Sequence, residues 1–247
     1  MKKISMFQTI SIAIFSLAVI GGIFYLLHVN GAFKLRAVQI SGNHYVTKED
    51  IARLIDIDFS KDLFQIDVDS IQRSLTRHPM VRSVVVSRSY PSVLKIKIAE
   101  HQLVAGVAGS EIVAASDTKK LIFDYPAEAL YDLPVITGIH FKYDDTGKRV
   151  PENDELLAYC IAILKKIREK DPVLYTDISE LHYDKDAGIS FFLKDNNLPV
   201  ILGKGKIAAR LNGFSALYHQ KLRRKQLKDV LAIDARFRGQ IVIKRKT

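Results

Sequence analysis

Residues 81–99 read VRSVVVSRSYPSVLKIKIA, and this stretch predicts two strands joined by a tight turn. Every second side chain from 94 to 98 is apolar and the two between them are lysines, so one face of the second strand is apolar and the other charged. Tyr90-Pro91-Ser92 separates the two apolar runs as a hairpin turn. We therefore predict antiparallel strands over 81–89 and 93–99.

The residues before this hairpin predict one more strand and two helices. Leu35–Ile40 has a strand pattern, and Thr47 with Asp50 three residues later forms a capping-box signature for a first helix. Asp67 is placed to cap a second helix, which His78-Pro79 ends because proline disfavours helical geometry in the residue before it. The order strand, helix, helix, strand, strand predicts a three-stranded sheet covered on one face by two helices.

The N-terminus carries an apolar segment long enough to cross a membrane. Residues 4–27 contain no side chain that is charged at neutral pH, and about 20 apolar residues in a helix span a hydrocarbon core of roughly 30 Å. A cleaved signal peptide is the alternative, with Ser16-Leu17-Ala18 at a spacing suited to cleavage. The apolar run continues past that point, so we predict an uncleaved anchor. Lys2 and Lys3 favour a cytoplasmic N-terminus.

Beyond residue 103 the pattern predicts a β-rich second domain interrupted by two helices. The first helix is centred on 156–167 and the second runs from about Lys206 to Lys228, before closing strands at 230–234 and 240–244. The other predicted strands are short apolar runs separated by turn residues, at 112–115, 121–123, 134–137, 178–182, 189–193 and 199–202. The fold class is therefore α+β, with a single transmembrane helix, a small α+β module and a β-rich domain.

Composition and charge narrow the class of function. Hydrophobic residues make up 48% and charged residues 26%, which excludes a disordered chain and a membrane protein with many transmembrane helices. The net charge is +10, but the residues from Lys204 onward hold 13 basic and 2 acidic side chains, whereas the rest is close to neutral. Since the anchor puts this basic region outside the cytoplasm, we predict no nucleic-acid partner. The single cysteine, Cys160, excludes an internal disulfide framework.

No pattern of catalytic or metal-binding residues stands out in the sequence. The seven histidines share no metal-ligand spacing, and there is no Gly-x-Ser-x-Gly elbow or phosphate-binding glycine loop. Gly203-Lys204-Gly205-Lys206 could hold an anion at a helix N-terminus, but a simple strand-to-helix turn is the better interpretation. We predict no enzymatic activity, no cofactor and no metal site.

Four motifs follow one another in the first module, VQISGN at 38–43, DLFQID at 62–67, HPMV at 78–81 and SRSYPSVLKI at 87–96. Together they resemble the FtsQ/DivIB family of bacterial division proteins. The order of elements is similar to that of a POTRA module. In the second domain, PVILGK at 199–204, the helix after it and AIDARF at 232–237 resemble the strand, helix and ending of the same family. Phe237 replaces the usual tyrosine, and the cytoplasmic tail of three residues is short for the family.

The resemblance implies a division scaffold without an active site. The implied organisation is a tail at 1–3, a transmembrane helix at 4–27, a linker at 28–34, a POTRA module at 35–103 and a partner-binding β domain at 104–247. The implied partners of the β domain are FtsB-like and FtsL-like proteins. The POTRA module and anchor would contact other division proteins, including the septal peptidoglycan synthase. The implied location is the inner membrane at the division site, with the bulk of the chain in the periplasm.

The residues themselves suggest how a partner would bind. If Gln240–Lys244 lies at a sheet edge, its unpaired backbone groups can accept a strand from another protein. By alternation Ile241 and Ile243 face one side, and Gln240, Val242 and Lys244 face the other. Arg236 and Phe237 are candidate anchor contacts. The alternative for these two is that Phe237 belongs to the core and Arg236 pairs locally.

Two other functions fit parts of the sequence. One POTRA module would also suit an accessory of outer-membrane assembly. A basic patch over Lys221–Lys228 would suit a protein that binds anionic lipid or cell-wall polymer.

Overall fold

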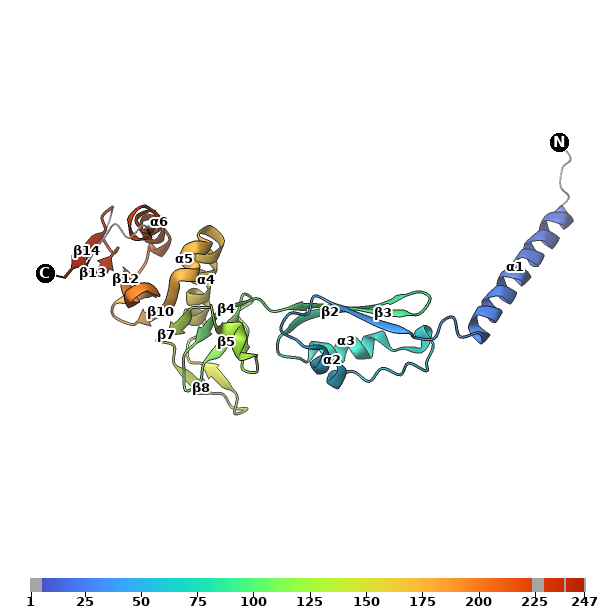
Figure 1. Ribbon diagram of the computed structural model, residues 1–247. Coiled ribbons are helices and arrows are strands. Elements are labelled where there is room, and N and C mark those ends of the chain that lie inside the picture. The colour runs from blue at the N-terminus through green and yellow to red at the C-terminus, as the bar shows by residue number, and fades with distance from the viewer. Residues whose placement is uncertain (1–5, 224–228, 238, 247) are drawn as a thin grey trace, which may run out of the picture. The chain divides into compact units, whose positions relative to one another are not determined.

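The computed structural model describes residues 6–223, 229–237 and 239–246 (Figure 1). The chain forms two compact units, Met1–Glu100 and His101–Thr247, which are described separately below. The elements of the first unit are α1 (Met6–Val29), β1 (Ala37–Ser41), α2 (Lys48–Leu54), the 3-10 turn η1 (Leu63–Gln65), α3 (Val68–Thr76), β2 (Val81–Ser89) and β3 (Val93–Glu100).

The first unit contains the predicted three-stranded sheet. Its strand order is β1-β3-β2, with β3 antiparallel to β2 and parallel to β1. Helices α2 and α3 lie on one face of the sheet (Figure 1). Leu94, Ile96 and Ile98 are at most 2% exposed while the lysines between them are exposed, so the period-two pattern places the core as predicted.

Residues of the sequence motifs stabilise the turns and helix ends of the first unit. Gly42 has a positive φ of 79°, and a Cβ there would lie 2.1 Å from the backbone oxygen of Ile98, so this turn requires glycine. The Arg88 guanidinium donates to the carbonyl oxygens of Leu63 and Ile66 at 2.9 and 2.6 Å, which ties the hairpin to η1. The capping box of Thr47 and Asp50 forms as predicted.

Helix α1 is the apolar N-terminal element. Ile10–Val29 is long and apolar enough to cross a membrane, and within the described ranges no other helix is. The helix begins within the predicted segment and continues two residues past Leu27 to Val29. Residues 4 and 5 of the predicted span lie outside the described residues.

The second unit holds one large sheet, a small hairpin and three α-helices. Its elements are β4 (Leu103–Val107), β5 (Val113–Ser116), β6 (Leu121–Ile122), η2 (Ala127–Leu130), β7 (Val135–Thr137), β8 (Phe141–Tyr143), β9 (Arg149–Pro151), α4 (Asp154–Lys170), α5 (Pro172–Asp177), β10 (Ile178–Asp184), β11 (Gly188–Leu193), η3 (Asp195–Asn197), β12 (Leu198–Gly203), α6 (Ile207–Leu217), the π-helical turn η4 (Tyr218–Leu222), β13 (Val230–Asp234) and β14 (Val242–Arg245).

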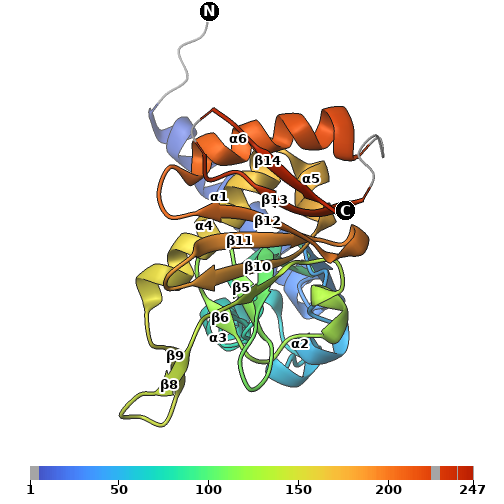
Figure 2. The same ribbon diagram turned by 90° about the vertical axis from the view of Figure 1, so that its left-hand side faces the viewer.

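The nine-stranded sheet has the order β14-β13-β12-β11-β10-β7-β4-β5-β6. Strands β10 to β14 follow one another across it (Figure 2). Along β11, Ile189, Phe191 and Leu193 are buried against the helices, whereas Ser190 and Phe192 between them are half-buried. One face of this part of the sheet therefore packs on α4, α5 and α6, and β14 and β6 form the two outer edges.

Several elements differ from the sequence prediction. Strand β4, helix α5 and the β8–β9 hairpin were not predicted. Helix α5 has only six residues, and its Pro172 is tolerated because it stands at the first helical position. The helix predicted to run from Lys206 to Lys228 is regular only to Leu217, where the π-helical turn η4 follows. Residues 224–228 lie outside the described residues.

Candidate partner-binding edge

Strand β14 lies at the end of the large sheet, and among the residues that the structure describes it pairs with β13 alone. The pairing is antiparallel, with Val242 opposite Asp234, Ile243 opposite Ile233 and Lys244 opposite Ala232. Gln240 and Ile241, which were predicted to belong to this strand, come before it. The strand is shorter at its start because its pairing with β13 begins at Val242, opposite Asp234, the last residue of β13.

Alternation along β14 shows which backbone groups face away from β13. The backbone N–H of Lys246 donates to the carbonyl oxygen of Asp229 at 2.8 Å, so it points inward. Backbone groups of successive strand residues point to opposite sides. Val242 and Lys244 therefore point inward as well, and the N–H and C=O groups of Ile243 and Arg245 lie on the outer edge.

The side chains next to this edge divide between a packed side and an open side. Ile241 and Ile243 are half-buried, and Ile241 packs against the main core cluster, with its Cδ1 4.0 Å from where a Cβ on Gly213 of α6 would stand. Gln240 and Lys244 are exposed, and Val242 is 47% exposed. The edge is thus fastened to α6 on one side and open on the other.

Arg236 and Phe237 have different environments. The Arg236 Nη2 atom lies 2.6 Å from Oδ2 of Asp234, and its Nε donates to Oδ1 at 3.0 Å, so Arg236 pairs locally. The hydrogen bonds from Arg236 hold the pKa of Asp234 below its ordinary value. Phe237 is 52% exposed, so it is not part of the core. The alternative interpretation is therefore right for Arg236, which pairs locally, and wrong for Phe237, which is not in the core.

The turn that leads into α6 is built around Gly203 and Arg210. Gly203 has a positive φ of 72°, and a Cβ there would lie 2.8 Å from Cγ of Arg236. The Arg210 guanidinium donates to the carbonyl oxygens of Leu202, Lys204 and Gly205. Because these contacts join the end of β12 to the first turns of α6, the Gly-Lys-Gly-Lys segment is a strand-to-helix turn with a structural role.

Basic side chains lie along this edge, and we call Lys244, Arg245 and Lys246 the basic rim. Lys244, Arg245 and Lys246 are exposed along β14 and just after it, and Lys221 and Arg223 are exposed at the end of η4. Three further members of the predicted basic cluster, Arg224, Lys225 and Lys228, lie outside the described residues, as does Arg238.

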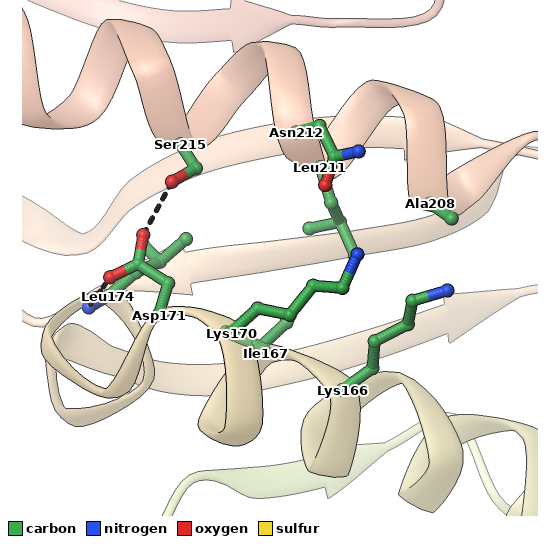
Figure 3. Close-up of a pocket in the computed structure, with 9 residues that line it drawn as sticks. All are labelled: Lys166, Ile167, Lys170, Asp171, Leu174, Ala208, Leu211, Asn212 and Ser215. Carbon is green, nitrogen blue, oxygen red and sulfur yellow. Dashed lines mark hydrogen bonds between the residues drawn. The ribbon is translucent and has the colours of Figure 1, made fainter.

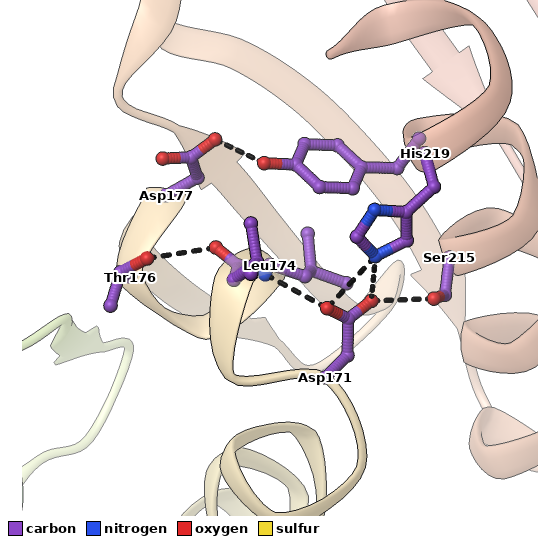
Figure 4. Close-up of polar contacts among 8 residues, drawn as sticks. Asp171, Leu174, Thr176, Asp177, Ser215 and His219 are labelled. Atoms are coloured by element: carbon purple, nitrogen blue, oxygen red, sulfur yellow. Dashed lines mark hydrogen bonds and ion pairs between the residues drawn. The ribbon is translucent and has the colours of Figure 1, made fainter.

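A polar cluster that the sequence did not predict holds the start of α5 against α6 and η4 (Figure 4). Asp171 caps α5 by accepting from the backbone N–H of Leu174, and it also accepts from the Ser215 hydroxyl at 2.5 Å. His219 Nε2 lies 2.9 Å from the same carboxylate oxygen. Although burial raises the pKa of Asp171, these contacts together leave it below its ordinary value. Ser215 and His219 lie 44 and 48 residues after Asp171 in the sequence, so no local sequence pattern predicts this cluster.

The Asp171 cluster is not arranged for nucleophilic catalysis. In a serine–histidine–aspartate relay the histidine stands between the serine and the carboxylate. Here Ser215 and His219 both contact the carboxylate of Asp171. The Tyr218 hydroxyl, one residue away, likewise donates to Asp177. These contacts fasten helices together.

A groove of about 370 Å³ lies beside this cluster, between α4 and α6 (Figure 3). Lys166 and Lys170 extend from α4 towards α6, and Leu211 and Ala208 of α6 form the opposite side. Its charged end is occupied by the Asp171–Ser215 hydrogen bond. The groove is therefore lined by two lysine side chains and by a carboxylate that already accepts a hydrogen bond.

Other candidate chemical groups are sparse in the part of the chain that the structure describes. Cys160 is fully buried, and burial raises the pKa of its thiol to about 12, so the reactive thiolate is disfavoured. Within the described ranges no group of three or more histidine, cysteine, aspartate or glutamate side chains is placed to hold a metal.

Comparison with known proteins identifies the class of this architecture and then its family. The "POTRA domain, FtsQ-type" matches residues 33–101, so the part of the first unit that follows α1 is a POTRA module of that type. The "Cell division protein FtsQ/DivIB, C-terminal" family matches residues 111–236. The chain belongs to the FtsQ/DivIB family of cell division proteins. The second match ends at Arg236, so Phe237 and β14 lie beyond it.

Relatives named for cell division cover most of the chain. The cell division protein FtsQ of Geobacter sp. (strain M21) is 25% identical over 213 residues, which is 86% of this chain and 76% of the relative. FtsQ of Geotalea daltonii is 26% identical over 225 residues, covering 91% and 80%. DivIB of Staphylococcus pseudintermedius is 25% identical over 105 residues, covering 42% and 36%. These matches favour a division protein over an accessory of outer-membrane assembly.

Proposed function

We propose that the protein is a single-pass division scaffold that captures its partners by strand addition at β14. The observation that carries the proposal is the unpaired outer edge of β14. A four-residue strand at a sheet end, with an open and largely polar outer side, is suited to pairing with a strand from another protein.

The partner strand would pair with the outward backbone groups of Ile243 and Arg245. Val242 and Phe237 offer exposed apolar surface close to this edge, with exposed fractions of 47% and 52%. Exposed aromatic side chains are frequent anchors in interfaces. Asp234 already holds the Arg236 side chain in one position. Binding of a partner therefore does not have to order this side chain.

The proposed arrangement in the cell follows from α1 and the resemblance to FtsQ. Helix α1 crosses the inner membrane once, with Lys2 and Lys3 on the cytoplasmic side and the POTRA module and the second unit in the periplasm. FtsB-like and FtsL-like proteins bind the second unit. The POTRA module contacts further division proteins, including the septal peptidoglycan synthase. The protein acts by linking these partners at the septum, without a catalytic step.

The test uses a proline at an outward-facing position of β14. In the full chain embedded in lipid nanodiscs, Arg245→Pro removes one outward N–H, and proline is tolerated on an edge strand facing solvent. We expect binding to the periplasmic segments of FtsB-like and FtsL-like proteins to weaken at least about tenfold, because a backbone hydrogen bond to the partner strand is lost.

Two control variants separate the backbone contribution from charge and from general damage. Arg245→Ala removes the same charge but keeps the N–H, so it should bind more tightly than Arg245→Pro. Phe123→Pro places a proline just after β6, at the opposite edge, and should leave binding unchanged. Equal binding by Arg245→Pro and Arg245→Ala would rule out strand addition at this position.

The basic rim is expected to act mainly on the rate of encounter. Opposite charge raises association rates and sets register more than it raises affinity, and salt screens it. We therefore expect an acidic partner segment, and an association rate that falls as salt is raised. An association rate and affinity indifferent to salt would contradict a role for the charge.

A further inference from the structure

Four aromatic rings in the first unit form a continuous chain of contacts from α1 to the β2–β3 hairpin. The ring centroids of Phe24 in α1 and Phe33 in the linker are 5.3 Å apart, and each packs on Phe64 of η1, at 6.4 and 5.0 Å. Phe64 in turn packs on Tyr90 at the hairpin turn, at 5.4 Å. We call these four residues the juxtamembrane aromatic cluster.

The position of Phe24 fixes the depth of this cluster. Helix α1, Met6–Val29, has 24 residues, which rise about 36 Å and so exceed a hydrocarbon core of roughly 30 Å by about 6 Å. Phe24 is five residues from the end of α1, about 7.5 Å along its axis. If α1 spans the bilayer, Phe24 lies at or inside the hydrocarbon boundary. The Phe64 ring in contact with it must then lie at the level of the lipid headgroups.

Exposed apolar side chains gather at this same end of the module. In residues 33–100 the large hydrophobic side chains that are exposed are Phe59, Phe64, Tyr90 and Val85. Phe64 and Tyr90, at 43% and 60% exposure, belong to the cluster. Phe59, at 53%, is two residues from Lys61, whose carbonyl oxygen accepts from Leu35 just after the linker. Three of the four are thus aromatic, and two of these, Phe64 and Tyr90, belong to the chain of rings that reaches Phe24 of α1. Aromatic rings favour the membrane interface.

Polar contacts fasten the end of α1 to the module beside the rings. His28 Nδ1 lies 3.2 Å from Oδ2 of Asp62, and Asp62 also forms a backbone bridge with Lys34. Lys61 lies 4.0 Å from Asp58, so its charge is partly balanced. Attraction to a bilayer at this end would therefore come from the rings more than from charge.

We propose that this end of the POTRA module is seated in the membrane, with Phe59, Phe64 and Tyr90 inserted among the lipid headgroups. The proposal rests on the proposed membrane anchor, and it adds a second attachment that holds the module against the bilayer surface. Neither charge nor a specific headgroup is required, so the ligand is the interface of a phospholipid bilayer, neutral lipid included.

The test exploits the absence of tryptophan from the chain. Single-tryptophan variants Phe64→Trp and Tyr90→Trp keep an aromatic ring at two cluster positions, and Phe24→Trp reports on α1 itself. His44→Trp is the control, because the His44 N–H bonds to Glu100 at the far end of β3, about 25 Å from Val93. Each full-chain variant is placed in vesicles of neutral phosphatidylcholine with or without bromine on the acyl chains, which quenches nearby tryptophan.

We expect brominated lipid to reduce emission roughly twofold or more at positions 24, 64 and 90, and to leave His44→Trp nearly unchanged, because only the first three sit in or against the acyl region. Quenching at 24 with none at 64 and 90 would overturn the seated module while leaving the anchor intact. No quenching at position 24 would overturn the anchor itself, and this inference with it. Quenching at 64 and 90 only with anionic lipid would overturn the claim that the rings supply the attraction.

Discussion

The two outer edges of the large sheet are built differently. Strand β6 has only two residues, and Tyr125 just after it donates its hydroxyl hydrogen bond to the backbone of Ile112 at the start of β5. Strand β14 has four residues, with exposed side chains at Val242 and Lys244 and outward backbone groups at Ile243 and Arg245. Very short strands and local covering are ways in which proteins protect an edge.

The contrast indicates which edge is available for pairing. The β6 edge is protected by its length and by the chain that follows it. The β14 edge is longer and is protected against self-association mainly by charge. Basic side chains discourage pairing with a second basic copy but favour an acidic partner. The same residues can therefore prevent aggregation and select a partner.

The largest effect that distinguishes the two edges should come from removing the support beneath β14. Phe214 of α6 is fully buried and packs on Phe191 of β11, with centroids 5.2 Å apart. Phe214→Ala should destabilise the second unit by about 3–5 kcal/mol, because a large buried ring leaves a cavity. Since Ile241 packs beside α6, amide hydrogen exchange should rise at β13 and β14 first.

A variant at the opposite edge provides the comparison. Ile122 of β6 is 1% exposed, so Ile122→Ala should also lower stability, by about 2–5 kcal/mol. Its exchange should rise first at β5 and β6. If both variants increase exchange uniformly over the sheet, the β6 and β14 edges do not unfold independently, and the two edges do not differ in local stability.

A smaller effect is expected from the polar cluster that holds α6 in place. Asp171→Asn keeps an N-cap for α5, since asparagine also accepts there, but it removes the charge beside Ser215 and His219. We expect a loss of about 1.5–3 kcal/mol near neutral pH, the range for hydrogen bonds that involve charged groups.

The pH dependence of this variant gives a second measurement. The folded-state pKa of Asp171 lies below its ordinary value, so its contribution is present above about pH 4 and is lost as pH falls through the folded pKa. The wild-type protein should therefore lose stability more steeply than Asp171→Asn on acidification below pH 4. Parallel denaturation profiles for the two proteins would contradict this assignment.

The sequence predicted the first unit more completely than the second. The strand, helix and turn signals of residues 35–99 are local, and capping residues such as Thr47 and Asp67 do what their types favour. In the second unit the missed elements have weak local signals. Strand β4 (LVAGV) is buried along its whole length and shows no alternation, so no period of two marks it.

The candidate site could be predicted only in part, because its geometry depends on pairing between distant segments. Alternation in the last strand predicted which side chains share a side. The sequence could not show that Asp234 would hold Arg236, because a pair two residues apart depends on the turn geometry. Nor could it show the Asp171–His219 contact, which joins residues 48 positions apart. The aromatic contacts between α1 and the POTRA module are non-local in the same way.

The smallest expected effect separates charge at one edge from charge at the other. Arg245→Glu reverses one exposed charge on β14, and it should slow association with an acidic partner segment roughly several-fold at low salt, with less change at high salt. Lys119→Glu makes the same reversal in the turn before β6, where the residue is also exposed. Association rates measured by surface plasmon resonance should show no change for Lys119→Glu. An equal slowing by both variants would mean that the overall charge of the protein, and not the β14 edge, guides the partner.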